Sequence, residues 1–280
     1  MSRTFDSHST KRVSYILTTK NRAQFLEKAL NSYQKLVTSR DELIIVDGAS
    51  IDETAIVVQR NKKIVTSFLS EPDKNPTEAF NKGILLAKGR YIKNLNDDDI
   101  VYPETMEKAI RIMEKHHEID FLVCGGTKEF RGKYWPFYVP EGVSYVGNFK
   151  NIFKYGGCGV GFIVRRSSIA LIGLYPQNHI VSDLAYLLQA VRLGANVKFC
   201  RLNVFNHKIF KHSAIITKKE LMDKDMSDLM KDYCSYGFYI KYKYDEAIHK
   251  LINFLFPIKY IIKLIKRNKK YEIIWDGNFS

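Results

Sequence analysis

At 280 residues the chain is long enough for one large domain, or for a domain of about 200 residues with an appendage. Its 45% hydrophobic and 26% charged residues are typical of a folded globular protein and exclude a largely disordered one. No uninterrupted apolar run reaches the roughly 18 residues of a membrane-spanning helix. The net charge of +14 indicates a polyanionic partner, either nucleic acid or an anionic membrane surface.

The first part of the chain alternates between two hydrophobic patterns. Short β-rich apolar runs predict strands, and segments with helical periodicity lie between them. The predicted strands are residues 13–17, 43–46, 64–69, 91–95 and 121–124, and the predicted helices are residues 23–34, 52–60, 77–87 and 103–116. Alternation of this kind predicts an α/β fold with right-handed βαβ units and a mainly parallel central sheet.

Polar clusters follow four of the predicted strands. They are residues 18–21, 47–50, 71–73 and 97–99. Because ligand sites in parallel sheets form at the carboxyl ends of the strands, we expect these clusters to converge on one edge.

The last of these clusters is a run of three carboxylates, Asp97, Asp98 and Asp99, shortly before Pro103. Three adjacent like charges repel one another, so a divalent cation or a set of hydroxyl groups would explain why they occur together. A solvated acidic turn before the helix that starts near Pro103 would explain them equally well. The run alone leaves both interpretations open.

The middle of the chain is less regular. Residues 130–146 are rich in aromatic residues and glycine, and predict a hairpin or an irregular lobe. Residues 155–161 form a glycine loop without the GxGxxG spacing, either a tight turn or a backbone that approaches a ligand closely. A strand at 162–165 follows, and then an amphipathic helix at 183–193, with Ser182 as its predicted N-cap, Asp183 in its first turn and Gly194 after its end.

Beyond residue 216 the pattern predicts helices only, at 218–231 and 246–270. Within the second, residues 250–270 carry seven basic residues and no acidic one: Lys250, Lys259, Lys263, Lys266, Arg267, Lys269 and Lys270. Its apolar positions have helical spacing, interrupted once by Pro257. We therefore expect residues 217–280 to be a basic amphipathic extension that contacts an anionic membrane, rather than an ordinary surface helix. Nucleic acid is not expected, because the apolar positions are mainly aliphatic and unsuited to stacking on bases.

We expect the protein in the cytoplasm, with the C-terminal extension as a possible peripheral contact with the inner face of the cell membrane. The N-terminal residues 1–12 are polar and lack the apolar core of a secretory signal. The four cysteines are widely spaced, form no CxxC pair and are predicted to be reduced thiols.

Taken in order, the polar clusters resemble those of the inverting, GT-A-fold glycosyltransferases of family 2. The resemblance covers about residues 13–213. The matching segments are 16–22 (ILTTKNR), 44–54 (IIVDGASIDET), 70–74 (SEPDK) with 79–83 (AFNKG), 95–103 (LNDDDIVYP) and 182–184 (SDL). The resemblance implies a GT-A domain at residues 1–216.

The resemblance also implies roles for individual residues. Asp98 would hold the Mn²⁺ or Mg²⁺ that bridges the donor phosphates, together with Asp99. A nucleotide-diphosphate sugar, with a UDP-sugar as the expected donor, would bind through Thr19, Asn21, Asp47, Ser50, Asp73, Lys82, Asp97 and His212. His212 fits the closing position over the diphosphate better than His207. Asp183 would be the catalytic base that takes the proton from the acceptor hydroxyl, and a helix N-terminal acid is the alternative for it.

The implied activity is transfer of a sugar, with inversion, to a glycan or lipid-linked glycan acceptor in the synthesis of a bacterial surface polysaccharide. Two positions depart from the family pattern, because Asn96 and Ser182 stand where acids are usual. They leave open a catalytically degenerate scaffold that only binds nucleotide sugar or membrane. A nucleotidyltransferase is disfavoured, since residues 18–21 contain no glycine.

Overall fold

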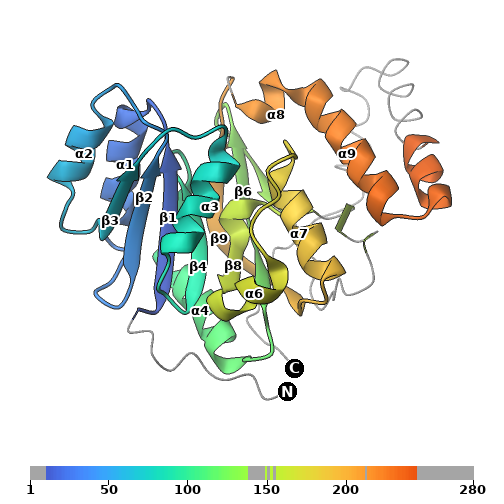
Figure 1. Ribbon diagram of the computed structural model, residues 1–280, viewed down its shortest axis with the longest axis horizontal. Coiled ribbons are helices and arrows are strands. Elements are labelled where there is room, and N and C mark those ends of the chain that lie inside the picture. The colour runs from blue at the N-terminus through green and yellow to red at the C-terminus, as the bar shows by residue number, and fades with distance from the viewer. Residues whose placement is uncertain (1–10, 138–148, 150–151, 154–155, 212, 245–280) are drawn as a thin grey trace.

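The computed structural model describes residues 11–137, 149, 152–153, 156–211 and 213–244 of the chain. Within them, one central β-sheet carries helices on both faces, and this confirms the predicted α/β class (Figure 1). No helix in this described part combines the length and apolar character needed to cross a bilayer.

The sheet joins a parallel half to a mixed half. From one edge to the other its strands are β3 (Ser67–Ser70), β2 (Glu42–Asp47), β1 (Val13–Thr19), β4 (Tyr91–Asn96), β8 (Phe162–Arg165), β6 (Phe121–Phe130), β9 (Val197–Ile209) and β5 (Ile100–Val101), and β7 (Lys133–Phe137) pairs with β6. β1 to β4 are parallel to one another, as predicted. β8 is antiparallel to both β4 and β6, whereas β6 and β9 are parallel.

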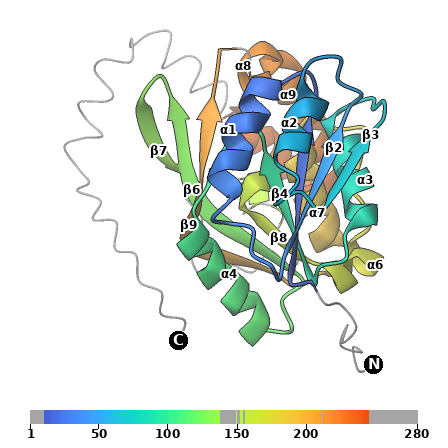
Figure 2. The same cartoon turned by 90° about the vertical axis from the view of Figure 1, so that its left-hand side faces the viewer.

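The helices divide between the two faces of the sheet. They are α1 (Ala23–Tyr33), α2 (Thr54–Arg60), α3 (Pro76–Leu86), α4 (Pro103–Lys115), α6 (Ile169–Ile172), α7 (Ser182–Arg192), α8 (Ala214–Thr217) and α9 (Lys219–Tyr233), with 3₁₀ turns η1 (Gly159–Gly161) and η2 (Arg166–Ser168). Buried residues of α1, α2 and α4 share one hydrophobic cluster, on the face seen in Figure 2. Those of α3, α6, α7 and α9 share a second cluster on the opposite face.

Side-chain alternation in β1 explains how one strand supports both clusters. Tyr15 and Leu17 point into the first cluster, and Ile16 between them points into the second. The helices meet these faces with apolar residues at helical spacing, as in α4, where Met106, Ile110 and Met113 are buried. A sheet covered on both faces needs strands that are apolar throughout, and this is why β2 is buried along its whole length.

Three features of the sheet differ from the sequence prediction or extend it. β9, with 13 residues, was not predicted at all, because its polar residues interrupt the apolar pattern. β6 continues to Phe130 and turns into β7, so the described part of the segment 130–146 is a hairpin. β5 pairs with β9 and closes the loop that carries the three acids.

The C-terminal helices also extend the prediction. α9 confirms the helix expected at 218–231, but its Leu229 lies in the same cluster as α7, so the boundary predicted at 216/217 separates segments that share a core. The basic helix expected at 246–270 lies outside the described residues.

Candidate active site

A cavity of about 320 Å³ lies at the carboxyl ends of β1 and β4. It is lined by Thr18, Thr19, Lys20, Arg22, Asp73, Pro76, Ala79, Asn96, Asp97 and Asp98. The hydroxyl of Thr19 donates to the Asp97 carboxylate at 2.8 Å, and Lys20 lies 3.9 Å from Asp73. Three of the four polar clusters therefore meet here, as the parallel topology predicts. We call this space the donor cavity.

The fourth cluster, after β2, supports the wall of the donor cavity. Asp47 is buried and accepts hydrogen bonds from the hydroxyls of Ser50 and Ser70. The Asn21 backbone N–H donates to the Ser50 hydroxyl at 2.7 Å, and the Asn21 side chain accepts from Ile51. These contacts join the loops after β1 and β2. Asp47, Asn21 and Ser50 thus stand beside the cavity rather than among its lining residues.

Lys82 stands apart from the cavity as well. Its ammonium lies 2.8 Å from Glu71 and 3.8 Å from Glu78, and donates to the carbonyl of Pro72. The positive charge is therefore already matched by carboxylates in this structure.

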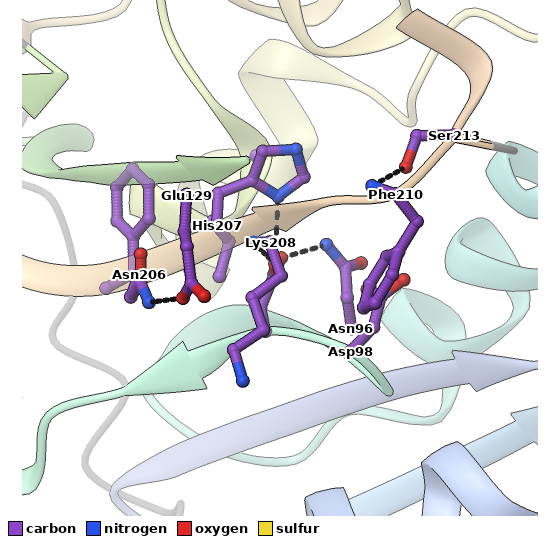
Figure 3. Close-up of polar contacts among 12 residues, drawn as sticks. Asn96, Asp98, Glu129, Asn206, His207, Lys208, Phe210 and Ser213 are labelled. Carbon is purple, nitrogen blue, oxygen red and sulfur yellow. Dashed lines mark hydrogen bonds and ion pairs between the residues drawn. The ribbon is translucent and has the colours of Figure 1, made fainter. Parts of the chain in front are cut away.

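The three adjacent acids have three different environments. Asp97 is buried against Thr19, and burial raises the pKa of its carboxyl to about 6 against the opposing attraction of Arg22. Asp98 is partly exposed and pairs with Arg22, with 2.6 Å between Oδ2 and Nη2. Asp99 is buried and accepts from the Asn96 amide, the Lys208 backbone N–H and the ring of His207. Figure 3 labels these three partners. Of the three acids, Asp98 lines both this cavity and a neighbouring one, Asp97 lines this cavity alone, and Asp99 lines neither.

Arg22 was not singled out from the sequence, although it follows Asn21 in the matched motif. Its guanidinium lies 3.3 Å from Asp97 as well as beside Asp98, and it stacks 4.4 Å from the centre of the Phe25 ring. Its Nε is buried without a hydrogen-bond partner among the described residues. Arg22 lines both this cavity and a second, larger one.

The second cavity has a volume of about 600 Å³ and continues from Arg22 and Asp98 toward α7 and α9. Besides Arg22 and Asp98, it is lined by both polar and apolar residues: Lys128, Phe137, Ile152, Phe153, Gly156, Gly157, Cys158, Ile180, Val181, Ser182, Asp183, Leu184, His207, Lys208, Ser213, Ile215, Met222 and Met226. We call it the acceptor cavity. The two cavities share Arg22 and Asp98, so a molecule in one would lie against a molecule in the other.

Asp183 lies in the first turn of α7, as predicted, and reaches the acceptor cavity. Its carboxylate accepts from the Gly159 backbone N–H at 2.8 Å. Burial raises the pKa of Asp183, against the hydrogen bond from Gly159 and the attraction of His207. A carboxylate with a raised pKa is a stronger proton acceptor, which suits a general base.

Close contacts explain two of the glycines in the loop at residues 155–161. A side chain at Gly159 would collide with the Asp183 carboxylate, and one at Gly161 would lie 2.6 Å from the carbonyl oxygen of Cys124. The sequence left open whether the loop is a tight turn or approaches a ligand. The backbone does make a close approach, and the group it approaches is Asp183.

The predicted N-cap of α7 is wrong. Ser182 is the first residue of the helix, Val181 occupies the cap position, and no side chain caps the helix from there. The Val181 backbone N–H instead donates at 3.0 Å to Asp225 of α9, whose carboxylate also contacts the ring of His179. α9 therefore holds the chain just before Asp183.

Of the two histidines considered, His207 reaches the site and His212 lies outside the described residues. Burial lowers the pKa of His207, but the Asp99 carboxylate outweighs that effect, and the net pKa is raised. Asn206, next to it on β9, donates to Glu129 of β6, which fixes the strand end that carries His207 (Figure 3).

The donor cavity fits a hard divalent cation that is held mainly by its substrate. Among the described residues, no three His, Cys, Asp or Glu side chains converge as a metal site. Asp98 offers one carboxylate, and Mn²⁺ or Mg²⁺ typically combines one or two carboxylates with substrate phosphates. Asp99 is engaged by three protein donors, so its predicted role as a ligand stays a prediction.

A family model described as "Glycosyl transferase family 2" matches residues 14–171, more than half of the chain. An uncharacterized glycosyltransferase of Haemophilus influenzae is 31% identical over 134 residues, which cover 48% of this chain and 42% of that protein. The chain thus spans less than half the length of this curated relative.

Two solved structures show the same fold. TarS of Staphylococcus aureus, in complex with UDP-GlcNAc, has a TM-score of 0.61 at 17% identity, over 74% of this chain and 61% of that one. Glucosyl-3-phosphoglycerate synthase of Mycobacterium tuberculosis, with Mn²⁺ and UDP, has a TM-score of 0.56 at 16% identity, over 80% of each chain. These likenesses concern the fold, which is the predicted GT-A fold. By its sequence match and its fold, the chain belongs to glycosyl transferase family 2.

Proposed function

We propose that the protein transfers a sugar from a nucleotide-diphosphate sugar to an acceptor hydroxyl with inversion at the anomeric carbon. The observation that carries the proposal is the pair of adjoining cavities. One offers polar and acidic groups suited to a nucleotide, and the other offers a buried carboxylate, Asp183. Both open onto Arg22 and Asp98.

The proposed chemistry needs one proton acceptor beside the acceptor hydroxyl. Asp183 accepts the hydroxyl proton as the oxygen attacks the anomeric carbon, and the bond to the nucleoside diphosphate breaks. The Gly159 N–H orients the carboxylate. Arg22 can turn from Asp98 toward the negative charge that develops on the leaving diphosphate. A Mn²⁺ or Mg²⁺ ion at Asp98 would supply further charge stabilisation there.

We propose a UDP-sugar as the donor. Support comes from TarS, which was solved with UDP-GlcNAc, and from the mycobacterial synthase, which was solved with UDP and Mn²⁺. In this chain Thr19, Asp73 and Asp97 line the donor cavity and offer acceptors for a base and a ribose. Asp47 and Lys82 belong to the same proposal, although neither is among the lining residues of the cavity.

A screen of nucleotide sugars tests the donor assignment. UDP-sugars should raise the melting temperature in the presence of Mn²⁺, because a ligand that binds only the folded state stabilises it by mass action. GDP-sugars and CMP-sugars serve as matched controls. Slow release of UDP from one of the UDP-sugars should accompany the stabilisation. Stabilisation by GDP-sugars alone would contradict the UDP assignment, and stabilisation by none of the compounds would contradict the function itself.

The same screen distinguishes the degenerate scaffold, which two substitutions keep open. Asn96 donates to Asp99 at 2.6 Å and so has a structural partner in place of a metal. Ser182 leaves Asp183 as the acid at the helix start. Nucleotide binding without any release of UDP, in the presence of acceptor glycans, would favour a binding module.

We propose a glycan acceptor, in the synthesis of a bacterial surface polysaccharide. TarS, a poly(ribitol-phosphate) β-N-acetylglucosaminyltransferase, is 25% identical to this chain over 115 residues, which cover 39% of this chain and 20% of TarS. The apolar part of the acceptor cavity also suits a lipid-linked glycan.

A membrane contact through the basic residues 250–270 goes with that acceptor. The protein should co-sediment with vesicles that contain anionic lipid, and the binding should weaken with salt, since each basic residue near the surface adds about 1 kcal/mol. A full-length variant with the seven basic residues changed to glutamine is the control. Salt-insensitive binding, or equal binding by the variant, would contradict the contact.

A further inference from the structure

Lys93 is a buried lysine that lines neither the donor cavity nor the acceptor cavity. It lies on β4, and its side chain is 0% exposed. None of the ion pairs among the described residues includes it. Burying an ammonium group without a carboxylate partner is costly, so an ordinary core position would hold an apolar residue instead. A functional role would explain why a lysine is buried at this position.

The Lys93 ammonium bonds to backbone carbonyls directly behind the acceptor cavity. It donates to the carbonyl of Val160 and, at 2.9 Å, to that of Asn94. Val160 is the middle residue of the η1 turn. Burial lowers the pKa of Lys93 to about 8, with Cys124, Cys158, Asp99 and Asp183 acting in the opposite direction. The ammonium is therefore still mostly charged at neutral pH.

The η1 turn connects Lys93 to Asp183. Gly159, one residue before Val160, donates its backbone N–H to the Asp183 carboxylate at 2.8 Å. The absence of a side chain at Gly159 lets the two groups approach that closely. Any shift of the Val160 peptide would move the Gly159 N–H, and the carboxylate with it.

We propose that Lys93 is a positioning residue for Asp183: its ammonium anchors the η1 turn through the Val160 carbonyl and places a buried positive charge against the turn that holds the Asp183 carboxylate. This inference rests on the proposed function of Asp183 as the base. It extends that function to a residue on a central strand which contacts neither cavity.

Several groups besides Lys93 act on Asp183 electrostatically. Burial raises the pKa of Asp183, His207 on β9 and Lys93 on β4 lower it, and Asp99 raises it. Cys158 and Tyr175 also interact with Asp183. The two positive charges thus come from opposite sides of the pair β6 and β8. Lys93 can be removed without touching the hydrogen bond between His207 and Asp99.

The test is Lys93→Met in the full chain, which shortens the side chain by one heavy atom and removes the charge. Titration of the Asp183 carboxyl by NMR with ¹³C-labelled aspartate, assigned against Asp183→Asn, should move to higher pH. The affinity for UDP with Mn²⁺, measured by calorimetry, should stay within about two-fold. UDP release from the donor found in the screen should fall on the order of ten-fold at pH 7, because misplacing a catalytic group costs rate. The pH below which UDP release slows should rise together with the pKa of Asp183.

Stability provides a readout that separates positioning from packing. The pKa of Lys93 is lowered in the folded protein, so its burial costs stability below about pH 8, and the cost disappears as the pH rises toward 10.5. Lys93→Met should therefore melt no lower than the parent at pH 7, and any gain should shrink above pH 8. A lower melting temperature with an unchanged Asp183 titration would make Lys93 a merely structural residue.

Two further variants complete the experiment. Lys108→Met removes the same charge from an exposed position on α4 and should leave Asp183 unchanged. An equal shift in that variant would overturn the proposal. Lys93→Gln keeps a donor for Val160 without the charge, so it should shift the Asp183 titration but lose less rate, and it replaces Lys93→Met if the latter does not fold. Full activity of Asp183→Asn would contradict the proposed function. An unchanged pKa of Asp183 in Lys93→Met would contradict this inference alone.

Discussion

Asp183→Asn should lower turnover by about 100-fold or more while the affinity for UDP persists. Asparagine has the same shape as aspartate, and its oxygen can still accept from the Gly159 N–H, so the acceptor cavity keeps its form. What is lost is the capacity to take a proton. Steady-state rates with donor and acceptor, together with calorimetry for UDP and Mn²⁺, measure the two quantities separately.

For Asp183→Asn we also make a prediction about stability that is independent of activity. Burial raises the pKa of Asp183, so its ionised carboxylate is costly in the folded protein above its pKa. A neutral amide removes that cost, and we expect the melting temperature to stay level or rise at pH 7. Collapse of donor affinity, or a rate close to that of the parent, would assign Asp183 another role.

Asp98→Ala should abolish the dependence of UDP binding on Mn²⁺. Asp98 is the acid that faces both cavities, and its loss removes the carboxylate to which the ion would bind. Calorimetry with UDP, with and without Mn²⁺, should give equal affinities in the variant and clearly different ones in the parent. Transfer should fall below detection, because the charge of the leaving diphosphate is no longer offset.

The ion pair between Arg22 and Asp98 leads to a further expectation for UDP binding by Asp98→Ala. In the parent its guanidinium is held by Asp98 at 2.6 Å, and the substitution releases it toward the diphosphate. Metal-free UDP affinity should therefore be retained or increased in Asp98→Ala. Asp228→Asn, which changes an exposed acid on α9, is the matched control and should behave as the parent. Stimulation by Mn²⁺ that survives in Asp98→Ala, or full transfer by the parent in excess chelator, would contradict the metal assignment.

Local sequence patterns predicted the donor side of the molecule well. β1, β2 and β4 are short apolar runs that end in polar clusters, and parallel pairing alone brings Thr19 beside Asp97. The neighbours of a cluster could not be predicted in the same way. Nothing in the sequence indicates that Lys82 is matched by Glu71, or that Asp99 faces inward while Asp98 faces the cavities.

The acceptor side was harder to predict, because it depends on contacts between distant segments. β9 has a mixed burial pattern, since its first half packs in the core and its last residues line the site. Single-strand periodicity misses such a strand. Likewise Ser182 has the chemistry of an N-cap, but Val181 occupies the cap position and is fixed by its hydrogen bond to Asp225. A lysine within an apolar run is usually exposed, whereas Lys93 lies on a strand in the middle of the sheet and is buried.

The position of β9 in the sheet affects the order in which contacts can form as the protein folds. The strands that bear the donor cavity pair within the first hundred residues, whereas Asp99 acquires its partner His207 from 108 residues further along the chain. Contacts this distant in sequence form slowly, because the intervening loop must close first. During synthesis, β1 to β4 are therefore available to pair well before Asp99 and Asp183 are held in place. The contact between Asp99 and His207 is complete only when β9 lies between β6 and β5.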